Sequence, residues 1–237
     1  MGMNQEVGVQ ERLKLEETII GDSVREGWEA FKARPGIIIG MMALFIVIIA
    51  IGQSIITQAF VSDVVTMNVV SQIFGLFTTV FSAGIYLTTL KMVRRESVNF
   101  GLITSGFGRT VPLIVAYILL IIACLIGVIL LVIPGIIIAL GLSQWLFVVM
   151  DRQELGGVEA LKASWEMMKG YKLKYFGFML LLLLINILGM LALIVGLVVT
   201  VPLSMLAMAS FYNRVLIINA AKPEIPATSN VYDSMNG

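Results

Sequence analysis

The sequence predicts an all-α integral membrane protein, with six transmembrane helices arranged as three hairpins, each preceded by a cytoplasmic amphipathic helix. Two observations predict this class. Apolar residues make up 59% of the 237 residues and charged residues only 13%, whereas soluble proteins are about a quarter charged. All 16 Lys and Arg residues lie at one set of ends of the long apolar runs. Because short cytoplasmic loops collect Lys and Arg, those ends and both termini are expected in the cytoplasm.

The first two predicted spans run from Gly36 to about Phe60 and from about Asn68 to Leu90. At a rise of about 1.5 Å per residue, each is long enough to cross a hydrocarbon core of about 30 Å. Asp63 lies between them and is the only charged residue that this arrangement places outside.

The next apolar run, from Val111 to Met150, predicts two spans. One helix of this length, kinked at Pro134, would be about 60 Å long, twice the core thickness. Pro134 and Gly135 are expected to form the reversal, because proline removes a backbone donor and glycine permits a turn. The same argument divides the run from Phe176 to about Ala220 near Pro202.

A segment with helical apolar spacing precedes each odd-numbered span. In the first, Ser23 and Glu26 have the spacing of a capping box, and Pro35 ends the helix. In the second, Asn99 is the expected cap, and in the third Gly170 is the expected terminator. The apolar face of each predicted helix is formed in turn by Val24, Trp28 and Phe31; by Phe100, Ile103 and Phe107; and by Val158, Leu161, Trp165 and Met168.

The first and third segments share a short fragment, in which Trp28-Glu29-x-x-Lys32 recurs as Trp165-Glu166-x-x-Lys169. An internal repeat and chance both account for so short a match. Two placements are also open for these helices. They either lie in the membrane interface, with tryptophan at headgroup depth, or cap the bundle on its cytoplasmic side.

The chain is expected to form a membrane domain over residues 36–220, flanked by a cytoplasmic segment at 1–35 and a flexible cytoplasmic tail at 221–237. The start of the chain is polar and mixed in charge, unlike a signal peptide, so an uncleaved cytoplasmic N-terminus is expected. No loop is long enough for a soluble catalytic domain.

The composition excludes several kinds of chemistry. Histidine is absent, which removes the commonest general acid–base residue and metal ligand. We therefore expect no enzyme activity and assign no catalytic, cofactor-binding or metal-binding residue and no cofactor. A net charge of +1 gives no basic surface for nucleic acid. Cys124 is a lone apolar residue within a span.

Polar residues within the spans are few, and they support two interpretations. Gln144 and Asn186 are expected to form hydrogen bonds between helices. A transporter would instead use them, with Gln53 and Gln72, to line a polar path.

Arg214 is the one basic residue expected below the membrane surface. A lone charge facing lipid there is costly, so Arg214 is expected to face the bundle and to pair with Asp151 or with nearby carbonyl groups. The alternative is that Arg214 extends alone to the headgroups.

Three short sequences in the second half carry a family resemblance. They are Ile133-Pro134-Gly135-Ile136, then Glu159 to Trp165 (EALKASW), then Lys169-Gly170. Together they resemble the YciC-like membrane proteins of prokaryotes, and the membrane domain attached to some glycerophosphodiester phosphodiesterases. The resemblance is best over residues 111–220. It implies a six-helix protein of the prokaryotic cytoplasmic (inner) membrane and carries over no catalytic residue.

The sequence thus predicts a non-catalytic polytopic membrane protein, a scaffold or accessory subunit that organises lipid or a partner complex. The alternative is a transporter or permease for a small molecule or a lipid. The expected partners are membrane lipids or another membrane protein, and the oligomeric state is not predicted. The structural and interface candidates are Trp28, Pro134, Gly135, Gln144, Asp151, Trp165, Asn186 and Arg214.

Overall fold

The computed structural model describes residues 2–130, 132–192 and 196–221. These residues form helices and no strand. In chain order the helices are α1 (Gly2–Ala33), α2 (Pro35–Ala59), α3 (Val64–Val93), the 3₁₀ helix η1 (Phe100–Arg109), α4 (Thr110–Leu130), α5 (Val132–Leu142), α6 (Trp145–Asp151), α7 (Gly157–Met167), α8 (Lys172–Leu191) and α9 (Leu197–Ala220).

Six helical segments are long and apolar enough to cross a membrane, which confirms the predicted number of potential spans. They are Pro35–Ala59, Val64–Val93, Phe100–Gly127, Ile133–Asp151, Lys172–Leu191 and Leu197–Ala220. The predicted tail lies outside the described residues from residue 222 onward.

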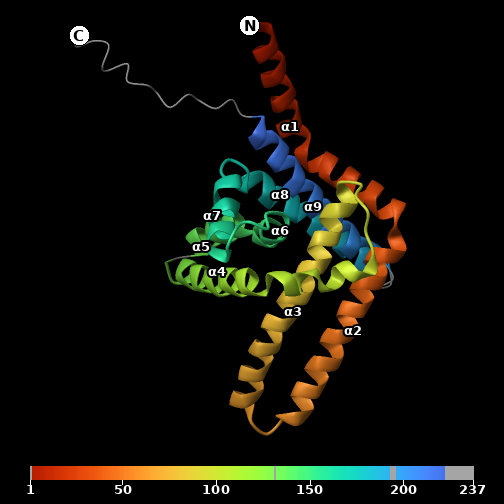
Figure 1. Ribbon diagram of the computed structural model, residues 1–237, viewed down its shortest axis with the longest axis vertical. Coiled ribbons are helices and arrows are strands. Elements are labelled where there is room, and N and C mark those ends of the chain that lie inside the picture. The colour runs from red at the N-terminus through yellow and green to blue at the C-terminus, as the bar shows by residue number, and fades with distance from the viewer. Residues whose placement is uncertain (1, 131, 193–195, 222–237) are drawn as a thin grey trace, which may run out of the picture.

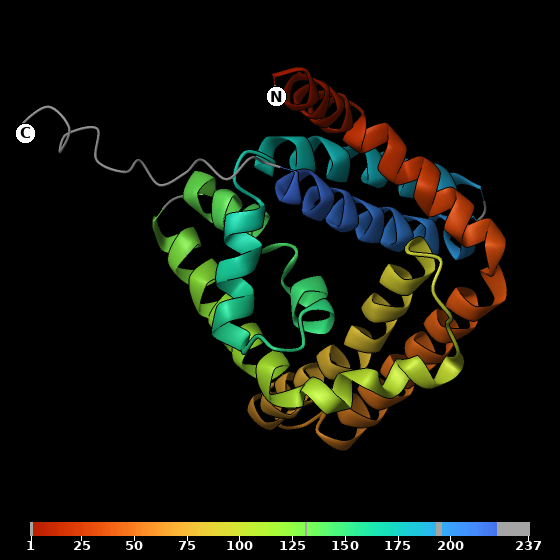
Figure 2. The same ribbon diagram turned by 45° about the horizontal axis from the view of Figure 1, so that its top comes forward.

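The helices do not form one parallel bundle. α2 and α3 lie side by side and project from the rest of the molecule, whereas α4 runs across their direction (Figure 1). α1 lies along α9, which brings the first described helix onto the last (Figure 2). The α2–α3 pair is therefore surrounded by protein only near its upper end.

The larger apolar core lies where α3, α6, α8 and α9 meet. The rings of Phe147 and Tyr212 stack with their centroids 5.3 Å apart, and those of Phe178 and Phe211 stack at 5.0 Å. All four side chains are fully buried. These rings lie in potential spans, where close packing rather than exclusion of water holds helices together, so this region fixes α9 in the interior.

Both predicted reversals are misplaced. Pro134 is the third residue of α5, and Pro202 lies within α9. A proline near the start of a helix costs little, because the first N–H groups have no partner within the helix. Gly135 instead lies against α4, where a Cβ added to Gly127 would be 2.8 Å from the Gly135 Cα. The glycines thus serve close helix packing.

The fourth potential span is broken, which the sequence analysis does not predict. α5 ends at Leu142 and α6 begins at Trp145, with a turn at Ser143 and Gln144 between them. The polar pair in an otherwise apolar run is the signal that marks this site in the sequence.

The predicted capping box at Ser23 is wrong, because α1 is already helical long before this residue. The Ser23 hydroxyl donates to the carbonyl oxygen of Ile19 at 2.6 Å, inside the helix. The preceding residues are mostly Glu, Leu, Lys and other strong helix formers, which extend the helix backwards. The predicted end at Pro35 is confirmed, since α1 stops at Ala33 and α2 begins at Pro35.

α1 packs on α9 through a glycine rather than through its tryptophan. A Cβ on Gly27 would lie 2.7 Å from the backbone nitrogen of Ala207, so the two helices approach closely. Trp28 is 41% exposed and stacks on Phe31 at 5.7 Å. Much of the Trp28 side chain therefore remains on the protein surface.

The other two predicted helices differ in form. η1 follows Asn99, but the Asn99 side chain makes no capping hydrogen bond. Gly170 has a left-handed φ of 84° beyond the end of α7, as the sequence predicts for a terminator.

η1 lies directly on the backbone of α3. Gly84 of α3 faces the backbone of Leu102 and Ile103, and Gly106 of η1 faces the carbonyl of Val80. A side chain at either glycine would overlap these backbone atoms. The contact therefore depends on glycine on both elements.

Candidate functional site

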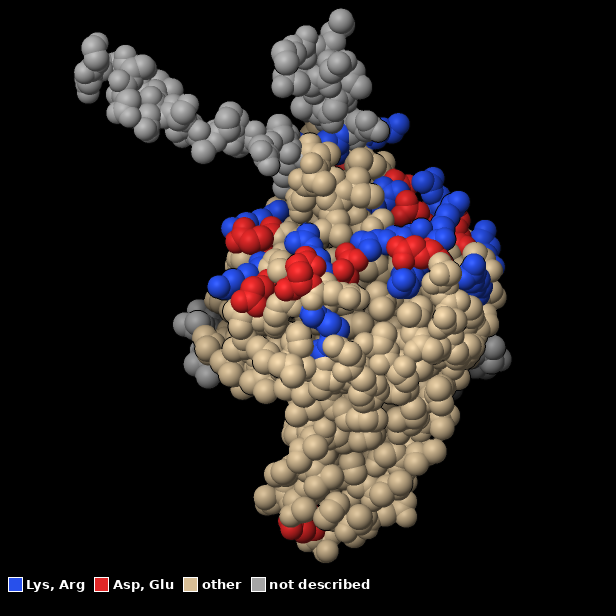
Figure 3. All heavy atoms as spheres, viewed as in Figure 1, with Lys and Arg blue, Asp and Glu red and all other residues tan. Residues whose placement is uncertain are grey.

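Charged side chains gather in a band at one end of the molecule (Figure 3). The described Lys, Arg, Asp and Glu residues other than Asp63 belong to α1 and its junction with α2, to the loops and helix ends between α3 and α4 and between α6 and α8, to α7, and to Arg214 of α9; we term this part of the molecule the charged end. Asp63 lies in the α2–α3 connection and caps α3 by accepting from the Thr66 backbone N–H at 3.1 Å. The charge asymmetry of the sequence is thus a spatial asymmetry of the fold.

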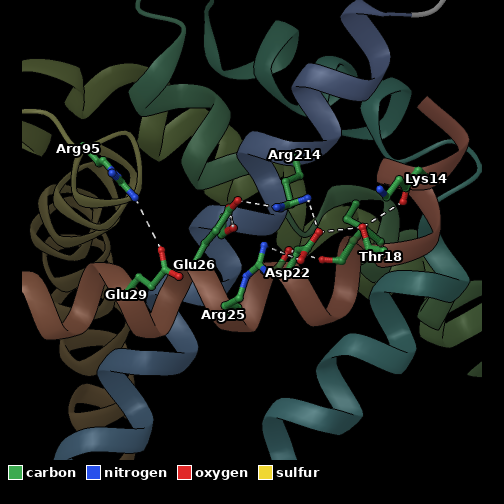
Figure 4. Close-up of polar contacts among 11 residues, drawn as sticks. Lys14, Thr18, Asp22, Arg25, Glu26, Glu29, Arg95 and Arg214 are labelled. Carbon is green, nitrogen blue, oxygen red and sulfur yellow. Dashed lines mark hydrogen bonds and ion pairs between the residues drawn. The ribbon is translucent and has the colours of Figure 1, made fainter. Parts of the chain in front are cut away.

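Arg214 of α9 joins α1 at the centre of the charged end (Figure 4). Its side chain lies 3.1 Å from an Asp22 carboxylate oxygen and 2.5 Å from a Glu26 oxygen. Ser210, one turn earlier, donates to the other oxygen of Glu26. Arg214 is only 8% exposed, so these carboxylates offset the cost of burying its charge.

The electrostatics of this cluster favour the charged form of Asp22. The Thr18 hydroxyl donates to the Asp22 carboxylate at 2.8 Å and, with Arg214 and Arg25, lowers the Asp22 pKa below its usual value, although partial burial opposes the shift. The stability gained from the lowered pKa is present above the unfolded pKa of Asp22. It is lost as the pH falls through the folded value.

A second cluster joins α3, α6 and α9. The Arg94 guanidinium forms a two-pronged ion pair with Asp151 and donates from Nε to Asn213 Oδ1 at 3.0 Å. Tyr212 also donates to Asp151, at 2.9 Å. Chiefly through the hydrogen bond to Asp151, the Arg94 pKa is raised, despite partial burial.

The predicted partner of Arg214 is therefore wrong, although the prediction that Arg214 faces the bundle is confirmed. Asp151 is engaged by Arg94, and Arg214 is engaged by Asp22 and Glu26. The predicted pair rests on a shared depth, because both residues lie near the charged ends of their predicted spans. Depth does not determine which face of a helix a residue occupies, and α1 was not expected to reach α9.

Further polar contacts hold α1 and η1 in place. The Lys174 ammonium donates to the Glu16 carbonyl at 3.0 Å, and Tyr171 donates to the Glu16 carboxylate at 3.1 Å. Arg109 at the end of η1 donates to the carbonyl groups of Gln153 and Leu155. Hydrogen bonds and ion pairs therefore connect most of the elements that meet at the charged end.

Ser164 of α7 closes the break in the fourth span. Its hydroxyl accepts from the Gln144 backbone N–H at 3.2 Å and donates to the Gly141 carbonyl at 3.1 Å. Both groups would otherwise lack a partner, because the turn interrupts the helical ladder. The short helix α7 thereby completes the hydrogen bonding of a potential span.

Trp165 extends the same contact. Its ring lies against Gly141, where a Cβ would collide with it, and the Lys172 ammonium lies 3.2 Å from the ring centroid. Cations over a tryptophan face are attracted by its ring electrons. Trp165 therefore ties α5 to the start of α8, whereas Trp28, its counterpart in the possible repeat, makes no such contact with a span glycine.

We predict that Ser164→Ala lowers the free energy of unfolding by about 1 to 3 kcal/mol, because it leaves a buried N–H and a buried C=O unpaired. The measurement is unfolding in detergent micelles. Lys162→Ala, on the exposed face of the same helix, is the control and should be close to neutral. Equal losses in the two variants would show that the hydrogen bonds of Ser164 do not stabilise the α5–α6 break.

The polar residues expected in a transport path lie apart. Asn186 of α8 donates to Ser204 of α9 at 2.8 Å, which is a contact between helices, as expected. Gln144 is fully buried at the α5–α6 break. Gln53 lies on the exposed side of α2 with Ser71 at 3.4 Å.

Gln72 of α3 lines an apolar groove of about 320 Å³ between α3 and α4. Gln53, Gln144 and Asn186 are absent from its lining. Among the described residues, no group of three or more Cys, Asp or Glu side chains is arranged to hold a metal ion.

Comparison with known proteins matches part of the chain to a protein family. The model of a family described as "Protein of unknown function (DUF975)" matches residues 119–219. No curated protein and no solved structure matches the chain. The matched segment includes Ser164, Asp151 and Arg214 but not α1, which carries both carboxylates that pair with Arg214.

Proposed function

We propose that this is a non-catalytic, multi-pass membrane protein that acts as a scaffold or accessory subunit and organises lipid or a partner complex. The observation that carries the proposal is the pairing of its buried cation Arg214 and its half-buried cation Arg94. Arg214 joins α1 to α9, and Arg94 joins α3 to α6 and α9. These charges hold helices together and are not presented to a substrate.

A finer topology accompanies this proposal. We place the charged end in the cytoplasm of a prokaryotic cell and the α2–α3 connection outside the inner membrane, with both termini cytoplasmic. The supporting observation is the one-sided distribution of Lys and Arg. α2 with α3, α4 with α5, and α8 with α9 make contact as consecutive pairs, which supports three hairpins, preceded by α1, η1 and α7 as cytoplasmic amphipathic helices.

A kinship with YciC-like proteins, and with the membrane domain of some glycerophosphodiester phosphodiesterases, belongs to the same proposal. It rests on the Pro134-Gly135 and ALKASW sequences, which lie within the segment matched by the family model. The structure shows the physical role of two of these residues. Gly135 permits the approach of α4 and α5, and Ser164 closes the break in the fourth span.

A transporter is the alternative function. It would require the polar span residues to face one path through the protein. Their separation favours the scaffold, because Gln53 and Gln72 lie on the α2–α3 pair, whereas Gln144 lies at the α5–α6 break and Asn186 between α8 and α9.

Extraction of the protein in copolymer discs from its native membrane tests the scaffold role. An accessory subunit should retain one protein or lipid component in fixed ratio through dilution and size separation. Gln144→Ala and Asn186→Ala should leave that ratio unchanged, because neither residue belongs to a binding surface. Recovery of the protein with lipid in bulk membrane proportions and no other component would contradict the proposal.

The topology predicts a labelling pattern in intact cells. A cysteine placed at Asp63 should react with an impermeant thiol reagent added outside, whereas cysteines at Glu96 and Glu154 should react only after the cells are opened. Cys124→Ala removes the native thiol first. External labelling at Glu96 would overturn the assignment of the charged end to the cytoplasm.

A further inference from the structure

A cleft of about 510 Å³ opens at the charged end between α1, the end of α3 and α9. Its volume lies within the range of small-molecule sites. Its lining combines three Arg with three Glu residues over an apolar wall: Arg25, Arg34, Arg95, Glu26, Glu29, Glu96, Ala30, Ala33, Met92 and Val93, together with Asn213. The formal charges of these side chains cancel, so the cleft favours neither a simple anion nor a simple cation.

Several of these side chains already form ion pairs within the protein, so fewer of them remain to bind a ligand. Glu26 holds Arg214 at 2.5 Å, Glu96 holds Lys91 at 3.1 Å and Arg25 holds Asp22 at 3.0 Å. Arg34 forms no ion pair with any residue that the structure describes. Arg95 and Glu29 are 3.7 Å apart, with side chains 86% and 50% exposed.

A pair so long and so exposed contributes little to stability. A ligand that carries a phosphate and an ammonium group can therefore separate Arg95 from Glu29 at small cost. Arg95 and Arg34 would then bind the phosphate, for which guanidinium groups are well suited. Glu29 would accept hydrogen bonds from the ammonium.

The backbone of Arg95 is consistent with a role for its side chain. Arg95 lies just beyond the end of α3 with a left-handed φ of 59°, and it is the only such residue other than glycine in the part of the chain that is described. Its N–H donates to the Met92 carbonyl at 3.1 Å, and that of Glu96 donates to the Lys91 carbonyl at 2.8 Å. Glycine is the usual residue at this position of such a cap, so arginine is held there at a conformational cost.

The position of the cleft indicates where its ligand comes from. Ala33 and Arg34 immediately precede the first potential span at Pro35, and Met92 and Val93 end the second. The cleft thus lies level with the ends of two spans, at the depth of lipid headgroups. Its apolar wall can contact the first carbons of the lipid acyl chains, which a free headgroup lacks.

We propose that this cleft binds the headgroup of a phospholipid with a primary ammonium group, such as phosphatidylethanolamine. The phosphate is held by Arg34 and Arg95 and the ammonium by Glu29. A primary ammonium donates hydrogen bonds to Glu29, whereas the quaternary ammonium of phosphatidylcholine cannot. The inference rests on the proposed function in one respect, that the charged end lies at a membrane surface.

Native mass spectrometry of the purified protein in detergent tests the proposal, with phosphatidylethanolamine, phosphatidylcholine and phosphatidylglycerol of the same acyl chains. The wild-type protein should bind phosphatidylethanolamine about tenfold more tightly than the other two lipids, the difference expected from a charge-assisted hydrogen bond. Equal binding of the three lipids would overturn the inference. So would binding of glycerophosphoethanolamine as tightly as the lipid itself, because a free headgroup would then suffice.

Three variants identify the binding groups. Arg34→Gln should weaken phosphatidylethanolamine binding about tenfold, and Glu29→Gln should remove the preference over phosphatidylcholine. Arg95→Gly should also weaken binding about tenfold while the midpoint of unfolding stays unchanged or rises, since glycine relieves the left-handed backbone. A loss of binding in this variant therefore cannot be attributed to misfolding.

Matched controls change the same charges outside the cleft. Glu17→Gln on the exposed side of α1 and Lys162→Gln on α7 should bind lipid as the wild-type protein does. Equal losses in the controls would overturn the assigned site. The two proposals fail in different ways. If the protein shows no lipid preference but retains a partner in copolymer discs, this inference alone is overturned. If it binds lipid specifically but retains no component in the discs, the scaffold role is contradicted.

Discussion

Replacement of Arg214 by methionine is expected to lower the free energy of unfolding by about 3 kcal/mol. The substitution removes the cation through which α9 bridges Asp22 and Glu26, and it leaves the two carboxylates close together without it. Breaking such a pair costs more than the pair contributes, because the carboxylates that remain are only partly exposed to solvent. Unfolding in mixed detergent micelles measures the loss.

A double-mutant cycle identifies the partner of Arg214. Arg214→Met combined with Glu26→Gln should show a coupling above about 0.5 kcal/mol, the limit for additive sites. The cycle of Arg214→Met with Asp151→Asn should be additive, since Asp151 is engaged by Arg94. The opposite pattern would restore the pair that depth along the spans suggests and would contradict the position of α1.

Gly84→Ala is expected to be of similar severity, with a loss of about 3 kcal/mol in the free energy of unfolding. The added methyl group would lie 2.6 Å from the carbonyl carbon of Ile103. Backbone on both sides leaves no flexible side chain to move aside, so η1 must separate from α3. Increased proteolysis in the segment around η1 should accompany the lower stability.

Gly75→Ala is the matched control on the same helix. Nothing lies within 4 Å of the Cβ that it would add, and alanine is favoured over glycine in a helix by up to about 1 kcal/mol. The expected result is neutral or slightly stabilising. A loss equal to that of Gly84→Ala would show that helix propensity, and not the approach of η1, decides the outcome.

The sequence predicts the class of this fold from physical constraints that act within each segment. An apolar run of sufficient length must become a span, which is why all six potential spans are found. Basic residues next to these runs likewise define the charged end, because their position relative to the runs is read directly from the sequence. The prolines are less informative, because proline is compatible both with a turn and with the first turns of a helix, and Pro134 and Pro202 lie within helices.

The contacts between segments are not predictable from these patterns. The partner of Arg214 lies on a helix 188 residues earlier in the chain, and no periodicity specifies that α1 crosses to α9. Ser164 lies in the ALKASW sequence that carries the family resemblance, yet its role requires the broken span to be known. The cleft brings α1, α3 and α9 together, so none of its residues is distinctive alone.

The packing of α1 on α9 has a consequence for the order of assembly. A ribosome adds about 5 to 20 residues per second, so the 188 residues that separate Glu26 from Arg214 take roughly 10 to 40 s to synthesise. During this time Gly27 and the carboxylates of α1 have no partner on α9. The first helix to leave the ribosome must therefore wait, exposed or held by another protein, until the last span is inserted.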